Sequence, residues 1–219
     1  MPATRIYCSG PLFCPEEVGG MSAIAHVLED AGHHTFLPHR DGLEGYVMRF
    51  GNIAVPGIST PVRQRIDQAI FALDVYELLE RCDAVVCNLN GRVPDEGMIV
   101  EAALAYAAGK PLVLYKDDVR APFGGHDNSM LTALTQGRLI TRLADIPSAV
   151  QQALRQRPSS ASVSTPALSA DLQKAVTYGR RLSQALSHLP DTAGKKQWSP
   201  EVIEAVLAEA GSSAHQALS

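Results

Sequence analysis

Apolar and polar residues alternate along this chain in two distinct patterns. Short runs rich in β-branched and aromatic residues are typical of strands, and the longer stretches between them repeat apolar positions at helical spacing. The predicted strands cover residues 5–10, 34–38, 84–90, 111–115 and 137–141. The predicted helices lie near residues 16–31, 61–81, 97–109 and 144–156.

Strands that alternate with helices form a parallel sheet covered on both faces. We therefore predict a five-stranded, doubly wound sheet of the flavodoxin-like or Rossmann-like class over residues 1–156. Residues 157–170 are rich in Ser, Pro and Ala and predict a linker. Residues 171–219 predict a C-terminal helical extension, with helices near 171–188 and 199–210. Whether this extension docks on the sheet, contacts a partner or forms a small module stays open.

Composition excludes several classes of partner. A net charge of −4 argues against nucleic acid, since a surface that follows phosphates needs a basic excess. No run of about 18 apolar residues and no signal-like apolar opening occur, so we expect a cytoplasmic protein without membrane contact. The four cysteines show no CxxC pair and no histidines at zinc spacing, which favours buried reduced thiols and no metal site.

One glutamate stands out in the segment GMIVEAALAYAAG, residues 97–109. Between Met98 and Ala108 the only charged residue is Glu101, on a helix that is otherwise apolar and Ala-rich. A buried carboxylate is costly unless something compensates its charge. Glu101 lies about one turn into a helix that follows the third strand, where the positive end of the helix dipole favours an anion. An exposed charge on a partly solvated helix is the alternative.

Two further carboxyl groups are candidates for a role in the same chemistry. Asp74 lies on a helix whose apolar positions cover most of its surface, and Asp95 directly precedes the helix of Glu101. A carboxylate in an apolar pocket is a nucleophile toward an oxocarbenium-like sugar carbon, while a second carboxyl exchanges a proton with the leaving group. GxSxG, P-loop and GxGxxG motifs are absent, which weakens hydrolase-triad, ATP and hydride-transfer chemistry.

Several segments together resemble the nucleoside 2-deoxyribosyltransferase family. The resemblance covers about residues 4–150 and rests on RIYCSGPLF, LPHRDGLEG, the long segment from IFALDVYELL to LYKDDVR, and HDNSM. Its most specific part is Asp95, a glycine two residues later, Glu101 six residues after the aspartate, and a helix that ends in Gly-Lys-Pro.

The resemblance implies a retaining double displacement that moves 2-deoxyribose between nucleobases. Glu101 would be the nucleophile and would carry the sugar as a covalent intermediate, with Tyr7 orienting its carboxylate. Asp74 and Asp95 would assist proton transfer and position the substrate. The resemblance implies neither a metal nor another cofactor.

The resemblance also implies a set of substrate-binding residues. Phe13 would pack on the nucleobase, Arg40 and Asp41 would contact the base edge, and Asn128 would reach into a neighbouring subunit to hold the 5'-hydroxyl. The full implied set is Gly10, Phe13, Arg40, Asp41, Asn128 and Met130. The expected partners are a deoxynucleoside, a free nucleobase and further copies of the chain, as a dimer or trimer of dimers with shared sites.

Plainer interpretations stay open for these residues and for the function. The plainer roles are core packing for Tyr7, a loop anchor for Phe13, helix capping for Asp95 and Asn128, and a surface ion pair for Arg40 and Asp41. An N-glycosidase of the same fold would pass the sugar to water, and a nucleoside 5'-monophosphate substrate would need a phosphate cradle such as Ser9 and Gly10. A non-catalytic nucleotide sensor that signals through the C-terminal helices is the other alternative.

Overall fold

The computed structural model describes residues 4–50, 60–91, 93–119, 126–156, 168–189, 191–192 and 195–212. They fall into two compact units, each assembled from two separate stretches of the chain. The sheet unit draws on Met1–Leu37 and Arg81–Ala167, and the helical unit on Pro38–Glu80 and Leu168–Ser219. In the described part of the chain no helix is long and apolar enough to cross a membrane.

Four parallel strands form the sheet of the first unit. They run in the order β2-β1-β3-β4, the flavodoxin-like arrangement of a doubly wound sheet. Their bounds are Arg5–Ser9 for β1, His34–Phe36 for β2, Ala84–Asn88 for β3 and Leu112–Tyr115 for β4.

The fifth predicted strand, over residues 137–141, is reduced to one residue. Ile140 makes a single parallel bridge with Tyr115, and its backbone hydrogen-bonds to both Leu114 and Lys116. The predicted strand count was therefore one too high. The backbone at Gln136 and Gly137 is left-handed, and the 3-10 turn η3 begins at Leu143, so only a short extended stretch remains between two turns.

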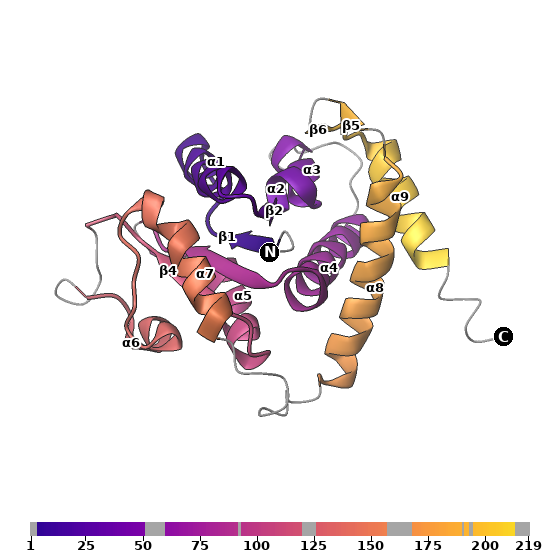
Figure 1. Ribbon diagram of the computed structural model, residues 1–219. Coiled ribbons are helices and arrows are strands. Elements are labelled where there is room, and N and C mark those ends of the chain that lie inside the picture. Colours follow the sequence, from indigo (N-terminus) through magenta and orange to yellow (C-terminus); the bar gives the residue numbers. More distant parts are fainter. Residues whose placement is uncertain are drawn as a thin grey trace. The chain divides into compact units, whose positions relative to one another are not determined.

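Helices cover both faces of the sheet, as predicted (Figure 1). Alternate residues of a strand point to opposite faces, so Ile6 and Cys8 face one side of β1, and Tyr7 and Ser9 face the other. The first face packs on α1 (Pro15–Asp30) and α7 (Ile146–Gln156) in one apolar core. Helix α5 (Glu96–Ala107) lies on the face of Tyr7 and Ser9, since both hydrogen-bond to Glu101.

Helix α5 has well-defined ends that fix its position after β3. The Asp95 side chain accepts a hydrogen bond of 2.7 Å from the Met98 backbone N–H and caps the helix N-terminus. At the other end Gly109 adopts φ +66°, and Lys110 N–H bonds back to the Ala105 carbonyl. A glycine in this conformation ends a helix without side-chain strain.

The second unit is mainly helical. It contains α2 (Pro38–Asp41), α3 (Glu44–Phe50), α4 (Thr60–Tyr76), α8 (Ala170–Ser187) and α9 (Pro200–Ser212), with a π-helical turn over Glu77–Arg81 after α4. A two-stranded antiparallel hairpin of β5 (Asp191–Thr192) and β6 (Lys195–Lys196) connects α8 to α9. Its core gathers apolar residues of α3, α4, α8 and α9, among them Tyr46, Leu73, Leu182, Trp198 and Leu207.

Helices α4 and α8 pack against each other at Gly179. A Cβ atom there would lie 2.0 Å from the Ala72 carbonyl oxygen and 2.6 Å from the Tyr76 Cβ. Only a residue without a side chain fits at this crossing. Nearby, the Ser183 hydroxyl donates a hydrogen bond of 2.9 Å to the buried Glu77.

The predicted helices are present within a few residues of their expected bounds, but α2 and α3 were not predicted. Of the predicted linker, residues 157–167 lie outside the described residues. The predicted division into residues 1–156 and 171–219 stays a prediction. The compact units are divided otherwise, because residues 38–80 group with the C-terminal helices.

Candidate active site

The Glu101 carboxylate is held by hydroxyl groups from strand β1. Tyr7 donates a hydrogen bond of 2.6 Å from its hydroxyl to Oε1, and the Ser9 hydroxyl donates to Oε2. Tyr7 and Ser9 are completely buried, whereas Glu101 keeps partial exposure. The arrangement fixes the carboxylate at the carboxyl end of the sheet, where ligands bind in doubly wound folds.

Tyr7 both packs in the core and hydrogen-bonds to Glu101, the two roles that the sequence left open. Its ring stacks on Phe36 with centroids 5.4 Å apart, and Phe36 is also its register partner on β2. The packed ring directs the hydroxyl group toward Glu101. Ser9, in contrast, was considered only for phosphate binding, although its spacing of two residues from Tyr7 puts both on one face of the strand.

The negative charge of Glu101 changes the pKa of a neighbouring thiol, Cys87. Cys87 lies opposite Ser9 in the register of β1 and β3. Burial first, and then the charge of Glu101, raise the pKa of Cys87 far above its usual value, while a hydrogen bond with Ser9 lowers it slightly. Cys87 therefore stays a protonated thiol and is not a nucleophile.

Cys87 shares a reduced, disulfide-free state with the three other cysteines. Cys8 and Cys82 are buried, and Cys14 is partly exposed. Among the described residues no group of histidine, cysteine or carboxylate side chains is arranged to hold a metal ion.

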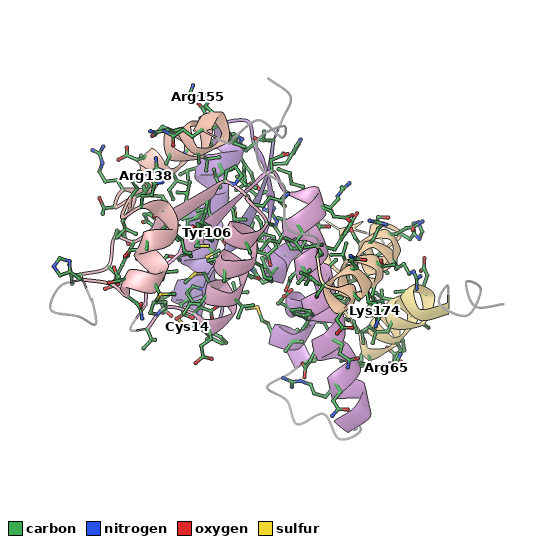
Figure 2. All side chains as sticks on the ribbon, turned by 90° about the horizontal axis from the view of Figure 1, so that it is seen from below. Cys14, Arg65, Tyr106, Arg138, Arg155 and Lys174 are labelled. Atoms are coloured by element: carbon green, nitrogen blue, oxygen red, sulfur yellow. The ribbon has the colours of Figure 1, made fainter. Side chains whose placement is uncertain are left out.

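The loop after β1 carries two of the expected substrate-binding residues. Phe13 is 84% exposed, and its backbone N–H bonds to Glu17. Glu17 also accepts from the N–H of Cys14, the residue before α1 that is labelled in Figure 2. The Phe13 side chain therefore projects from a fixed backbone and anchors no core. Gly10 is required by packing, because a Cβ there would lie 2.6 Å from the Met21 Sδ.

The loops after β3 and β4 are joined by an asparagine. Asn90 donates 2.7 Å to Asp117 and accepts from the backbone N–H groups of Asp117 and Asp118, while Gly91 N–H donates 3.1 Å to the Asp118 carboxylate. Burial and the neighbouring Asp117 raise the pKa of Tyr115 to about 12. This connection, which the sequence did not suggest, ties the segment before α5 to the end of the neighbouring strand.

Asn128 directly precedes the short helix α6 (Ser129–Thr132), and Met130 lies on that helix. Asn128 caps this short helix by accepting 2.9 Å from the Met130 N–H, and the Met130 side chain is 83% exposed. A buried ion pair of 2.5 Å between Lys116 and Asp127 anchors the segment to the end of β4. The capping alternative for Asn128 is thus realised, as it is for Asp95.

The other expected residues, Arg40, Asp41 and Asp74, belong to the helical unit. Arg40 and Asp41 form an ion pair of 3.0 Å and remain partly exposed. Asp74 forms a side-chain hydrogen bond with Glu44, whose Oε2 atom is buried. Burial raises the pKa of Glu44, and the contact with Asp74 offsets this only in part. The approach of these residues to Glu101 stays a prediction.

A sequence model of the nucleoside 2-deoxyribosyltransferase family matches residues 6–134, more than half of the chain. The chain belongs to this family. The matched segment contains all four strands of the sheet and the Tyr7, Ser9 and Glu101 cluster. Membership in the nucleoside 2-deoxyribosyltransferase family makes the protein a transferase-type enzyme of nucleotide metabolism, with nucleosides and nucleobases as its class of substrates.

Two solved structures illustrate the structural similarity. A conserved protein from Enterococcus faecalis V583 is 19% identical, with a TM-score of 0.49, and the match covers 68% of this chain and 98% of that chain. A 2-deoxyribosyltransferase from Bacillus psychrosaccharolyticus is 23% identical, with a TM-score of 0.43, and the match covers 65% of this chain and 90% of that chain. A search of curated proteins finds no match. The family assignment rests on the sequence match.

Proposed function

We propose that this protein transfers the 2-deoxyribosyl group between nucleobases through a covalent intermediate on Glu101. The observation that carries the proposal is the pair of hydroxyl donors on the two oxygens of this carboxylate. The donors are neutral, so they stabilise the negative charge without forming a salt bridge that would block attack. A fixed, charged carboxylate at the ligand-binding edge of the sheet is what a nucleophile toward a sugar carbon requires.

In the first half-reaction a Glu101 oxygen attacks C1' of a 2'-deoxynucleoside. The new C1'–O bond replaces the C1'–N bond, whose electron pair leaves with the base, and a carboxyl group supplies the proton that neutralises it. In the second half-reaction a different base attacks C1', and the C1'–O electron pair returns to Glu101. Two inversions give net retention at C1'.

Asp95 and Asp74 keep the roles that the family resemblance implies. Asp95 positions the sugar while it caps α5, and Asp74 exchanges the proton with the base. The hydrogen bond between Asp74 and Glu44 supports this role, because two carboxyl groups in contact share a proton.

The base is bound by apolar side chains and by a charged pair. Phe13 projects from the loop after β1 and Met130 from α6, and their large exposed apolar surfaces suit stacking on a planar base. Gly10 lies beside the sugar, and Arg40 and Asp41 bind the base edge. Asn128 completes the site of a neighbouring subunit in a homo-oligomer, where it binds the 5'-hydroxyl.

The test is base exchange by the wild type and by two variants of α5. Incubation with a 2'-deoxynucleoside and a different free base should yield the exchanged nucleoside. Glu101→Ala should lower this rate by about a thousandfold or more, since it removes the nucleophile. Glu96→Ala, an exposed glutamate of the same helix, should keep wild-type activity.

Mass spectrometry supplies the second measurement. Wild-type protein given a deoxynucleoside without an acceptor should carry a deoxyribosyl group on the peptide that contains Glu101. Release of free deoxyribose without exchanged nucleoside would identify a hydrolase instead. Absence of any turnover would favour a nucleotide-sensing role, and an active Glu101→Ala variant would refute the assignment of the nucleophile.

A further inference from the structure

Ser9 has a hydroxyl group whose place in the fold calls for an explanation. The residue is the last of β1 and is completely buried. A buried hydroxyl is unfavourable unless it has hydrogen-bond partners inside the protein. The Ser9 hydroxyl donates to Oε2 of Glu101, and the Tyr7 hydroxyl donates to Oε1.

The neighbour of Ser9 on strand β3 is Cys87. Cys87 pairs with Ser9 across β1 and β3, and the two side chains are hydrogen-bonded. As a protonated thiol, Cys87 presents no charged acceptor to Ser9. The charged acceptor on this face is Glu101, and the Ser9 hydroxyl donates to its Oε2 atom.

We propose that Ser9 is a positioning residue that stabilises Glu101 as the leaving group of the covalent intermediate. The inference rests on the proposed function. A hydroxyl bonds more strongly to a carboxylate than to the uncharged ester that forms when Glu101 carries the sugar. Ser9 therefore favours the step in which the C1'–O bond breaks and its electron pair returns to the carboxylate. In the same step the base nitrogen bonds to C1' and gives its proton to the carboxylate that protonated the first base.

The two hydroxyl donors differ in how much their side chains contribute to core packing. Tyr7 has a large ring stacked on Phe36, so its replacement alters packing as well as hydrogen bonding. Ser9→Ala removes a single oxygen atom from the same face of β1. It thus isolates the hydrogen bond to Oε2 from the packing of the strand.

The experiment measures how the enzyme partitions between the free and the covalent state. Wild type, Ser9→Ala, Ser9→Thr and Cys8→Ala each receive a deoxynucleoside without acceptor, and intact-mass spectrometry gives the ratio of deoxyribosyl-enzyme to free enzyme. A second base is then added, and the decay of the adduct is timed. Cys8→Ala is the matched control, because Cys8 is equally buried on the opposite face of β1.

Ser9→Ala should raise the ratio of covalent to free enzyme roughly tenfold or more and slow the decay of the adduct, because one hydrogen bond to a charged group is lost. Ser9→Thr keeps the hydroxyl and should restore the wild-type ratio, and Cys8→Ala should not change it. If Ser9→Ala does not fold, the nearly isosteric Ser9→Cys, a weak donor, should shift the ratio in the same direction.

A wild-type ratio in folded Ser9→Ala or Ser9→Cys overturns the role of Ser9, and so does an equal shift in Cys8→Ala. Either result leaves the nucleophile assignment intact, since the adduct on Glu101 still forms. Absence of any adduct in the wild type refutes the proposed function itself, and the inference about Ser9 falls with it.

Discussion

Glu101 in the sheet unit and Glu44 in the helical unit are both glutamates with a buried or partly buried carboxyl group, yet their partners differ. Glu101 accepts hydrogen bonds from the neutral hydroxyls of Tyr7 and Ser9. Glu44 meets another carboxyl, Asp74, and burial raises its pKa. Donors stabilise a carboxylate anion, whereas burial beside a second acid favours retention of a proton.

The difference shows how one residue type serves two chemical purposes. A carboxylate with hydroxyl donors is suited to attack a carbon atom, and a carboxyl pair that holds a proton is suited to give one to a leaving base. A retaining glycosyl transfer needs both groups. The proposed function assigns the first role to Glu101 and the second to Asp74, which contacts Glu44.

Subunit complementation is expected to give the largest effect, and it asks whether the sheet unit holds a complete site in one chain. Glu101→Ala and Asn128→Ala should each be nearly inactive. Mixed under conditions that exchange subunits, they should regain activity from hybrid sites that combine an intact Glu101 with an intact Asn128. In a dimer about a quarter of all sites are then complete.

Native mass spectrometry must show that hybrids have formed. If they form and activity stays at the level of the parents, Asn128 acts within its own chain or not at all. A wild type that is active as a monomer at assay concentration leads to the same conclusion.

The next effect concerns the stability of the helical unit. Gly179→Ala places a Cβ within 2.0 Å of the Ala72 carbonyl oxygen, so α4 and α8 must move apart. We expect the free energy of unfolding to fall by about 3 kcal/mol. Trp198 is the only tryptophan and lies in the core of this unit, so its fluorescence in a denaturant titration reports the loss.

Gly211→Ala provides the control for that measurement. Gly211 lies on α9 of the same unit, and a Cβ there meets no atom within 4 Å. Alanine favours helix over glycine, so this variant should keep or slightly raise the midpoint. Equal stability of both variants would mean that the close packing of α4 and α8 is not required.

The smallest expected effect is a pH dependence of stability that comes from Glu44. The folded-state pKa of Glu44 is raised above the ordinary value of 4.5, so its contribution to stability is complete below that pH and is lost as the pH rises through the raised pKa. Glu44→Gln removes this dependence. Relative to wild type, the variant should gain unfolding free energy as the pH is raised from 4 to 8.

Glu204→Gln is the control for Glu44→Gln, because Glu204 belongs to the same unit and forms an exposed ion pair with Arg65. It should show a much weaker pH dependence. If the stability difference between Glu44→Gln and wild type is the same at both pH values, Glu44 does not retain a proton in the folded state.

Much of the sheet unit was predictable because its signals are local. The apolar runs of β1 to β4 and the single charge on α5 are visible in the sequence, and the Asp95 cap follows from its place before a helix. The family resemblance pointed to Tyr7 beside Glu101, and the structure places a hydrogen bond there.

Contacts between distant segments were not predictable in the same way. Ser9 carries no signal beyond its spacing from Tyr7, since a serine at a strand end is equally compatible with a loop. The sequence predicted no helix between residues 38 and 50, because α2 and α3 are too short for a helical period to show. The partnership of Glu44 and Asp74 was missed for that reason.

The meeting of α4 and α8 at Gly179 also has a consequence for how the chain is made. The apolar residues of α4 that form the core with α8 leave the ribosome about ninety residues before that partner, a delay on the order of ten seconds. By the end of this interval all four strands of the sheet unit have emerged, whereas the apolar surface of α4 that packs on α8 is still uncovered. Exposed apolar surface of this kind favours aggregation, so we expect chaperone binding to protect the nascent chain until α8 emerges.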